Sequence, residues 1–135
     1  MFGLEIVLIV FAVSLLASLY LWIRVSGKNK FRASRAKFQA QMNRLDSASL
    51  DPKMLVLEYD KLLGAVLQEK YNSRENLGQI LKIKAKNFDA PSLNQVWSAH
   101  KLRNRIAHEM NFQPNNQEVS QAVYGFKRFI SRVLN

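Results

Sequence analysis

The sequence predicts an all-α fold in which a single N-terminal transmembrane helix precedes a small helical bundle. An apolar run without charged residues extends from residue 6 to residue 23. After residue 50, apolar side chains recur at intervals of three and four residues, which places them on one face of a helix. No stretch alternates apolar and polar residues as a half-buried strand does. These observations together favour the all-α class.

Residues 6–23 are long enough to cross a bilayer, since 18 residues span about 27 Å as a helix. Tyr20 and Trp22 lie at the C-terminal end of the run, where membrane helices carry aromatic residues. A signal peptide has a basic start, a shorter apolar core and a small-residue cleavage site. A buried core helix is the alternative, but so long a run is difficult to bury in so small a domain.

The basic residues follow the apolar run and do not precede it. Residues 24–50 carry seven basic side chains and one acidic side chain, out of a net charge of +10 for the whole chain. The positive-inside rule therefore predicts a single-pass protein of a plasma membrane or bacterial inner membrane, with its C-terminal domain in the cytoplasm. The excess positive charge favours anionic partners, either nucleic acid or an acidic membrane surface.

We expect three parts: a transmembrane anchor over residues 1–25, a basic juxtamembrane stalk over 26–50, and a helical domain over 51–135. A narrow apolar stripe runs along the stalk: Phe31, Phe38, Met42 and Leu45. The stripe suits a helix held against anionic lipid or a two-stranded coiled seam. A solvated connector is the alternative.

Four main helices are predicted in the helical domain. The N-cap signals are Asp51, which is followed by Pro52, and Asn115, which forms a capping box with Glu118. The first three helices are predicted over about residues 51–70, 73–86 and 92–110, with a loop over 87–92. A domain of this size has a marginal core, so dimerisation would stabilise it.

Arg103, Asn104 and His108 are the residues most indicative of chemistry. Arginine can hold a phosphate with two parallel hydrogen bonds, and histidine can transfer a proton near neutral pH. Together they could cleave a phosphodiester without a metal ion. On an ideal helix Asn104 and His108 share a face with His100, but Arg103 lies about 140° from His108. A symmetric dimer is therefore expected to be a better catalyst than a monomer.

A structural interpretation of the same helix end stays open. Arg and His side chains near a helix C-terminus interact favourably with its last carbonyls and its dipole. His100 is expected to be partly buried and hydrogen-bonded, while Lys101 and Arg105 are expected to be solvated. Glu109 either orients His108 or only pairs with Arg105.

Composition excludes several kinds of site. The chain has no Cys, only two His and no Gly-rich phosphate loop, which excludes disulfides, thiol catalysis and Cys-based zinc sites. We expect no metal ion and no cofactor.

The segment KLRNRIAHE at residues 101–109 resembles the signature of HEPN domains (higher eukaryotes and prokaryotes nucleotide-binding). That signature is an Arg, four to six residues and then a His, often with Asn after the Arg. The order of predicted helices over residues 51–134 is also similar to a HEPN domain. The resemblance implies a four- or five-helix up-and-down bundle that usually dimerises, with Arg and His of both protomers in one composite cleft.

Many HEPN domains are metal-independent endoribonucleases, including the toxins of toxin–antitoxin pairs. The resemblance implies that Arg103 polarises the scissile phosphate and that His108 acts as general acid or base. Asn104 would orient the His or contact the phosphate. RNA or a nucleotide is the expected ligand, with further RNA contacts from Lys82, Lys84, Lys86 and Arg105. Since other HEPN domains only bind or assemble, a non-catalytic binding or oligomerisation module at the membrane is the alternative.

Overall fold

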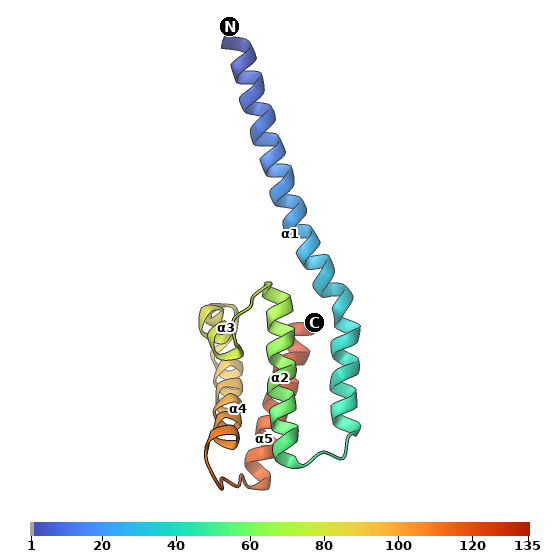
Figure 1. Cartoon of the computed structure of the whole chain (residues 1–135), viewed down its shortest axis with the longest axis vertical. Coiled ribbons are helices and arrows are strands. Elements are labelled where there is room, and N and C mark those ends of the chain that lie inside the picture. Colours follow the sequence, from blue (N-terminus) through green and yellow to red (C-terminus); the bar gives the residue numbers. More distant parts are fainter. Residues whose placement is uncertain (1) are drawn as a thin grey trace. The chain divides into compact units, whose positions relative to one another are not determined.

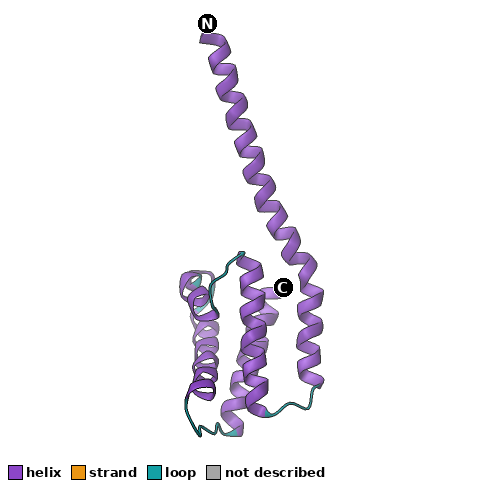
Figure 2. Ribbon diagram, viewed as in Figure 1, coloured by secondary structure: helices purple, strands orange, loops and turns teal. Residues whose placement is uncertain are grey.

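The computed structural model describes the backbone of residues 2–135 and the side chains of residues 3–135. Over this range the chain is helical, with short loops and no strand (Figure 2). The elements are α1 (Phe2–Ser47), α2 (Pro52–Tyr71), α3 (Leu77–Ile83), the short 3-10 helix η1 (Ala85–Asn87), α4 (Ala90–His108) and α5 (Asn116–Leu134) (Figure 1). The prediction of an all-α fold is confirmed.

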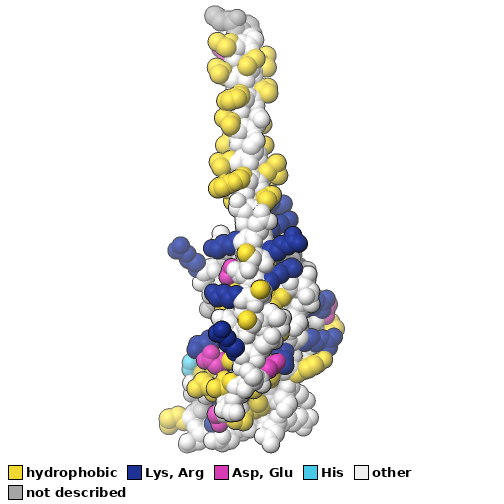
Figure 3. Space-filling model, turned by 90° about the vertical axis from the view of Figure 1, so that its right-hand side faces the viewer, with side chains coloured by type: hydrophobic (Ala, Val, Ile, Leu, Met, Phe, Trp, Pro, Cys, Tyr) yellow, Lys and Arg dark blue, Asp and Glu magenta, His cyan; other side chains and the backbone are white. Residues whose placement is uncertain are grey.

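The chain divides into two compact units, Met1–Ser34 and Arg35–Asn135. In the first unit, α1 carries exposed apolar side chains followed by a group of Lys and Arg side chains (Figure 3). By length and composition α1 is able to cross a membrane, and a signal sequence would pass the same test. The coarse prediction of a long apolar N-terminal helix is therefore confirmed.

The second unit is a helical bundle. Its helices are residues 35–47 of α1, then α2, α4 and α5, with α3 and η1 at one end (Figure 1). Helix α5 packs against both α2 and α4, and its apolar face supplies much of the core. The largest fully buried side chains include Tyr59, Leu63, Leu67, Phe126 and Ile130. Burial of these side chains is the main term that stabilises the unit.

The last turns of α1 belong to this bundle. Phe38 and Met42 are buried. The Tyr59 hydroxyl on α2 donates to the carboxylate of Asp46 at 2.5 Å, and the Lys127 ammonium on α5 lies 2.7 Å from the same carboxylate. The helix predicted for the stalk is present, but Phe38 and Met42 contribute to the bundle core and do not form a separate seam.

Local signals fixed two helix starts as predicted. The Asp51 carboxylate accepts a hydrogen bond from the Lys53 amide at 3.0 Å, and Pro52 begins α2. Asn115 and Glu118 form the predicted capping box, with hydrogen bonds of 2.8 Å in both directions.

Other boundaries differ from the prediction, including the end of the second helix, which lies at Ile83 and not near residue 86. Helix α3 begins at Leu77 and not near residue 73, because the cap residue after α2, Asn72, is left-handed (φ 47°) and the Asn76 side chain caps the next helix. Helix α4 begins at Ala90, because the Asp89 carboxylate accepts a hydrogen bond from the Ser92 amide. The predicted loop over 87–92 is correspondingly shorter.

Candidate functional site

A buried carboxylate on α2 faces the motif helix α4. Asp60 is 6% exposed and is the buried charged residue among the described side chains. It lies on the same face of α2 as the buried Val56, Leu63 and Leu67. A carboxylate in an apolar core requires partners, because an unpaired buried charge is strongly destabilising.

His100 and Arg103 of α4 are those partners. Oδ1 of Asp60 lies 2.6 Å from Nδ1 of His100, and Oδ2 lies 3.2 Å from Nε of Arg103. The second contact is an ion pair without an aligned hydrogen bond, because the buried Arg103 Nε has no hydrogen-bond partner among the described residues. One carboxylate therefore contacts an imidazole and a guanidinium that are three residues apart on α4, and we call this group the Asp60 cluster.

The His100 ring is held firmly within the Asp60 cluster. Its side chain is 14% exposed, and the ring lies edge-on to Trp97 with centroids 5.8 Å apart. Its Nε2 lies close to Gly78 of α3, where an added Cβ would be 3.4 Å away. With Nδ1 facing a carboxylate, the Nδ1 proton is the one that is hydrogen-bonded. The predicted partly buried, hydrogen-bonded His100 is confirmed.

The Arg103 guanidinium contacts neighbouring side chains along one edge, and the Arg103 side chain is partly exposed to solvent. Nη1 donates to Oδ1 of Asn104 at 3.1 Å, while Nε faces Asp60. The Arg103 side chain is 31% exposed. A guanidinium fixed in this way keeps donors available for an anion approaching from solvent.

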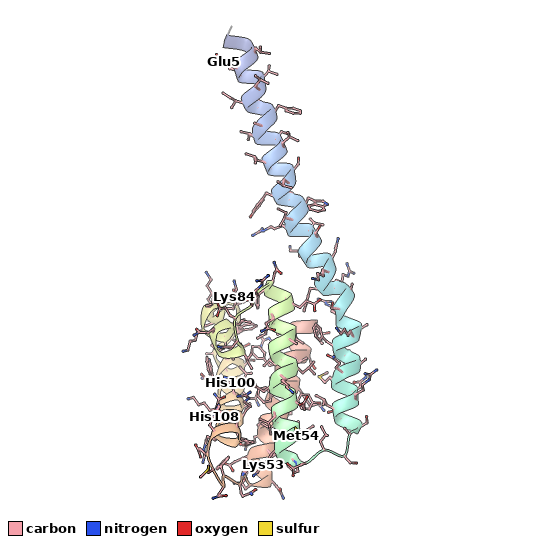
Figure 4. The ribbon with its side chains drawn as sticks, in the orientation of Figure 1. Glu5, Lys53, Met54, Lys84, His100 and His108 are labelled. Carbon is pink, nitrogen blue, oxygen red and sulfur yellow. The ribbon has the colours of Figure 1, made fainter. Side chains whose placement is uncertain are left out.

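His108 lies at the last residue of α4, near the end of the bundle opposite to Lys84 (Figure 4). Its side chain is exposed and makes no hydrogen bond or ion pair with the described part of the chain. Within one copy, Arg103 is joined to His100 through Asp60 and not to His108. Both residues lie within α4, so the separation of about 140° around the helix axis that the sequence predicts applies to them.

Arg105 and Glu109 pair with each other at the same helix end. The Arg105 Nε lies 3.2 Å from the Glu109 carboxylate, and the Arg105 guanidinium lies 3.9 Å above the centre of the Phe112 ring. Of the two alternatives for Glu109, the structure shows the pairing with Arg105. Arg105 also borders an open groove of about 780 Å³ between α4 and α5, which neither Arg103 nor His108 lines.

The lysines predicted to contact RNA lie far from His108. Lys82 is in α3, Lys84 follows α3 and Lys86 is in η1, which precedes α4 in the chain. His108 is at the other end of α4, whose 19 residues span about 28 Å. The structure therefore does not bring these lysines together with the motif.

The chemistry available at the motif is electrostatic and acid–base. The described residues contain no group of three His, Asp or Glu side chains that could hold a metal ion. The chain matches no family model, no curated protein and no solved structure.

Asp60 is the site residue that the sequence analysis missed. Its signal was its register: it follows Val56 by four residues and precedes Leu63 and Leu67 on the apolar face of the predicted helix. A charged residue in that register indicates a buried partner on a neighbouring element.

Proposed function

We propose that this chain is a membrane-anchored, HEPN-like endoribonuclease that needs no metal ion and acts as a homodimer with a composite Arg/His site. The observation that carries the proposal is the contrast between Arg103 and His108. Arg103 is fixed by Asp60 and Asn104 but is partly open to solvent. His108 is exposed, makes no hydrogen bond or ion pair within the described chain, and lies five residues further along α4.

The roles follow from the chemistry of the three motif side chains. The Arg103 guanidinium binds the scissile phosphate and offsets the negative charge that develops in the transition state. His108 removes the proton from the ribose 2′-hydroxyl or returns a proton to the leaving 5′-oxygen. Attack of the 2′-oxygen on phosphorus breaks the bond to the 5′-oxygen and leaves a cyclic phosphate. Asn104 keeps Arg103 oriented.

A second copy supplies the missing geometry. Arg103 and His108 of one helix are directed about 140° apart, so one copy cannot close both on a single phosphate. A two-fold axis near the end of α4 would place His108 of one copy beside Arg103 of the other. Anchoring by α1 confines the copies to a surface and raises their effective concentration.

The membrane topology is part of this proposal. Residues 6–23 span the bilayer, and the basic residues from Arg24 onward hold the bundle on the cytoplasmic side. RNA is the substrate class that the net charge of +10 favours on that side. Arg105, which is nearly half exposed beside the motif, provides an additional phosphate contact.

A non-catalytic binding or oligomerisation module is the second candidate. The specific observation that favours it is the Asp60–Arg103 ion pair at 3.2 Å. A neutralised guanidinium attracts a phosphate less strongly than a free one. In this case the Asp60 cluster only joins α2 to α4, and the motif has no catalytic role.

An RNA cleavage assay separates the two candidates. The full chain in nanodiscs is incubated with single-stranded RNA in chelator, beside Arg103→Ala, His108→Ala and the matched exposed-arginine control Arg128→Ala. The enzyme hypothesis predicts cleavage that falls by about 100-fold or more in the two motif variants and persists in the control. Equal background in all four proteins would exclude the enzyme.

A further inference from the structure

One end of the bundle combines exposed basic side chains with an exposed aliphatic one. We call it the α3–η1 surface and define it by the exposed Arg74, Lys82, Ile83 and Lys86 and the half-buried Lys84. We propose that this surface docks on anionic phospholipid headgroups of the membrane that α1 enters. The proposal rests on the membrane anchor of the proposed function and is independent of whether the motif cleaves RNA.

The α3–η1 surface lies at the end of the bundle where the chain enters from the N-terminal unit. Residues 35–47 of α1 and α2 are joined by only four residues, 48–51, and run antiparallel, so Arg35 and the C-terminal end of α2 share one end (Figure 1). Burial, and then the positive charge of Arg35, lower the pKa of Lys70 at this end of the bundle. Helix α3 follows α2 after a short turn at this same end.

The length of the chain between membrane and bundle allows contact. Residues 24–34 connect the end of the apolar run to Arg35. Eleven residues rise about 16 Å as a helix. This short connection tethers the adjoining end of the bundle within reach of the lipid headgroups.

The charge of this segment suits an anionic surface. Residues 70–86 carry five basic side chains and one acidic side chain. The nearby carboxylate of Asp89 is already paired with Arg132 and so does not offset these lysines. Lys84 lies 5.1 Å above the Tyr71 ring, which holds its ammonium group near the surface.

Ile83 distinguishes a lipid surface from an RNA track. Its side chain is 59% exposed although it lies between Lys82 and Lys84. An aliphatic side chain gains free energy by entering the interfacial layer of a bilayer, and flanking lysines can extend to the headgroups. The phosphate backbone of RNA provides no apolar layer in which the Ile83 side chain could be buried. Docking through this end would direct His108, about 28 Å away along α4, toward the cytoplasm.

The absence of Cys from the chain allows a direct proximity test. The full chain with Ile83→Cys carries a fluorophore and is reconstituted into vesicles that contain nitroxide-labelled lipid. One preparation is phosphatidylcholine alone, and the other contains about one third phosphatidylglycerol. Gln113→Cys, in the exposed α4–α5 loop at the opposite end, is the matched label control.

We expect quenching at position 83 to be about twofold stronger in the anionic vesicles and to weaken in about 0.5 M NaCl. The triple change Lys82→Gln, Lys84→Gln and Lys86→Gln should abolish the difference. An equal charge change elsewhere, Lys53→Gln, Lys61→Gln and Lys101→Gln, should preserve it.

Three results would overturn the proposal: equal quenching at positions 83 and 113, quenching at 83 that does not depend on anionic lipid, or no effect of the Lys82/Lys84/Lys86 variant. If that variant instead weakens RNA binding by the detergent-solubilised full chain and leaves quenching unchanged, the lysines serve RNA and the lipid proposal is wrong.

Discussion

Oδ1 of Asp60 lies 2.6 Å from Nδ1 of His100, and this contact joins the middle of α2 to the motif helix α4. The same carboxylate faces Arg103, so one buried charge fixes two side chains of α4. A buried carboxylate with two partners is strongly coupled to both, because removal of either side leaves the other group desolvated without compensation. The register of α4 on α2 therefore depends on Asp60.

The first prediction concerns Asp60 itself. Asp60→Asn keeps the shape of the side chain but removes its charge, and we expect the free energy of unfolding to fall by about 2 kcal/mol. Urea unfolding of the full chain in detergent micelles, followed by circular dichroism, measures the change. Glu58→Gln is the control, since Glu58 pairs with the exposed Lys61 and should cost less than about 0.5 kcal/mol. Equal losses in both variants would show that the Asp60 cluster has no special role.

The second prediction concerns the pH dependence of stability, through Asp46 and Tyr59. Burial raises the pKa of Asp46, but hydrogen bonds from Lys127 and Tyr59 outweigh it, so its pKa lies below 3.8. Burial, and then Asp46, raise the pKa of Tyr59 above 10.0. The lowered carboxyl pKa stabilises the fold above about pH 4, and this stability is lost as the pH falls further. The raised phenol pKa stabilises the fold below about pH 10, and this stability is lost as the pH rises.

The urea concentration at the midpoint of unfolding, measured across the pH range, tests the interaction between Asp46 and Tyr59. Asp46→Asn should reduce the loss of stability below about pH 4, whereas Glu75→Gln, an exposed carboxylate, should leave the acid limb unchanged. If the two variants have the same acid limb, Asp46 is not paired in the folded state.

The third prediction uses two glycines in helices. A Cβ at Gly64 of α2 would lie 3.9 Å from Leu77 Cβ, an ordinary contact, whereas a Cβ at Gly125 of α5 would lie 3.1 Å from Gln95 Cγ and 3.4 Å from its carbonyl oxygen. Gly64→Ala should therefore stabilise the fold by about 0.5–1 kcal/mol. Gly125→Ala should destabilise it by about 1 kcal/mol, because α4 must move. Melting temperatures of the two variants that shift in the same direction by the same amount would contradict the close packing of α4 and α5.

Much of the fold was predictable because its signals are local. Asp51 with Pro52, and Asn115 with Glu118, cap helices through contacts within four residues, and such contacts are visible in a sequence. The predicted start near Ser73 lies four residues before the observed start of α3, because Asn72 is left-handed and the Asn76 side chain caps α3. The packing of Phe38 and Met42 depends on contacts with distant parts of the chain, which a local stripe does not specify.

The candidate site was predictable only along one helix. The spacing of Arg103 and His108 fixes their divergence, since both lie on α4. The Asp60 cluster could not be predicted in the same way, because Asp60 and His100 are separated by 40 residues and only the packing of α2 on α4 joins them. Its one local sign was an acidic residue within the apolar register of α2.

Complementation between two inactive variants tests the composite Arg/His site most directly. Arg103→Ala and His108→Ala chains are co-expressed, purified together in nanodiscs and assayed for RNA cleavage in chelator. In a mixed dimer, one of the two sites combines an intact Arg103 with an intact His108 from the other copy. We predict that the mixture regains about one quarter of wild-type activity while each variant alone stays inactive. No cleavage by the mixture, under conditions where the wild-type chain cleaves, would contradict it.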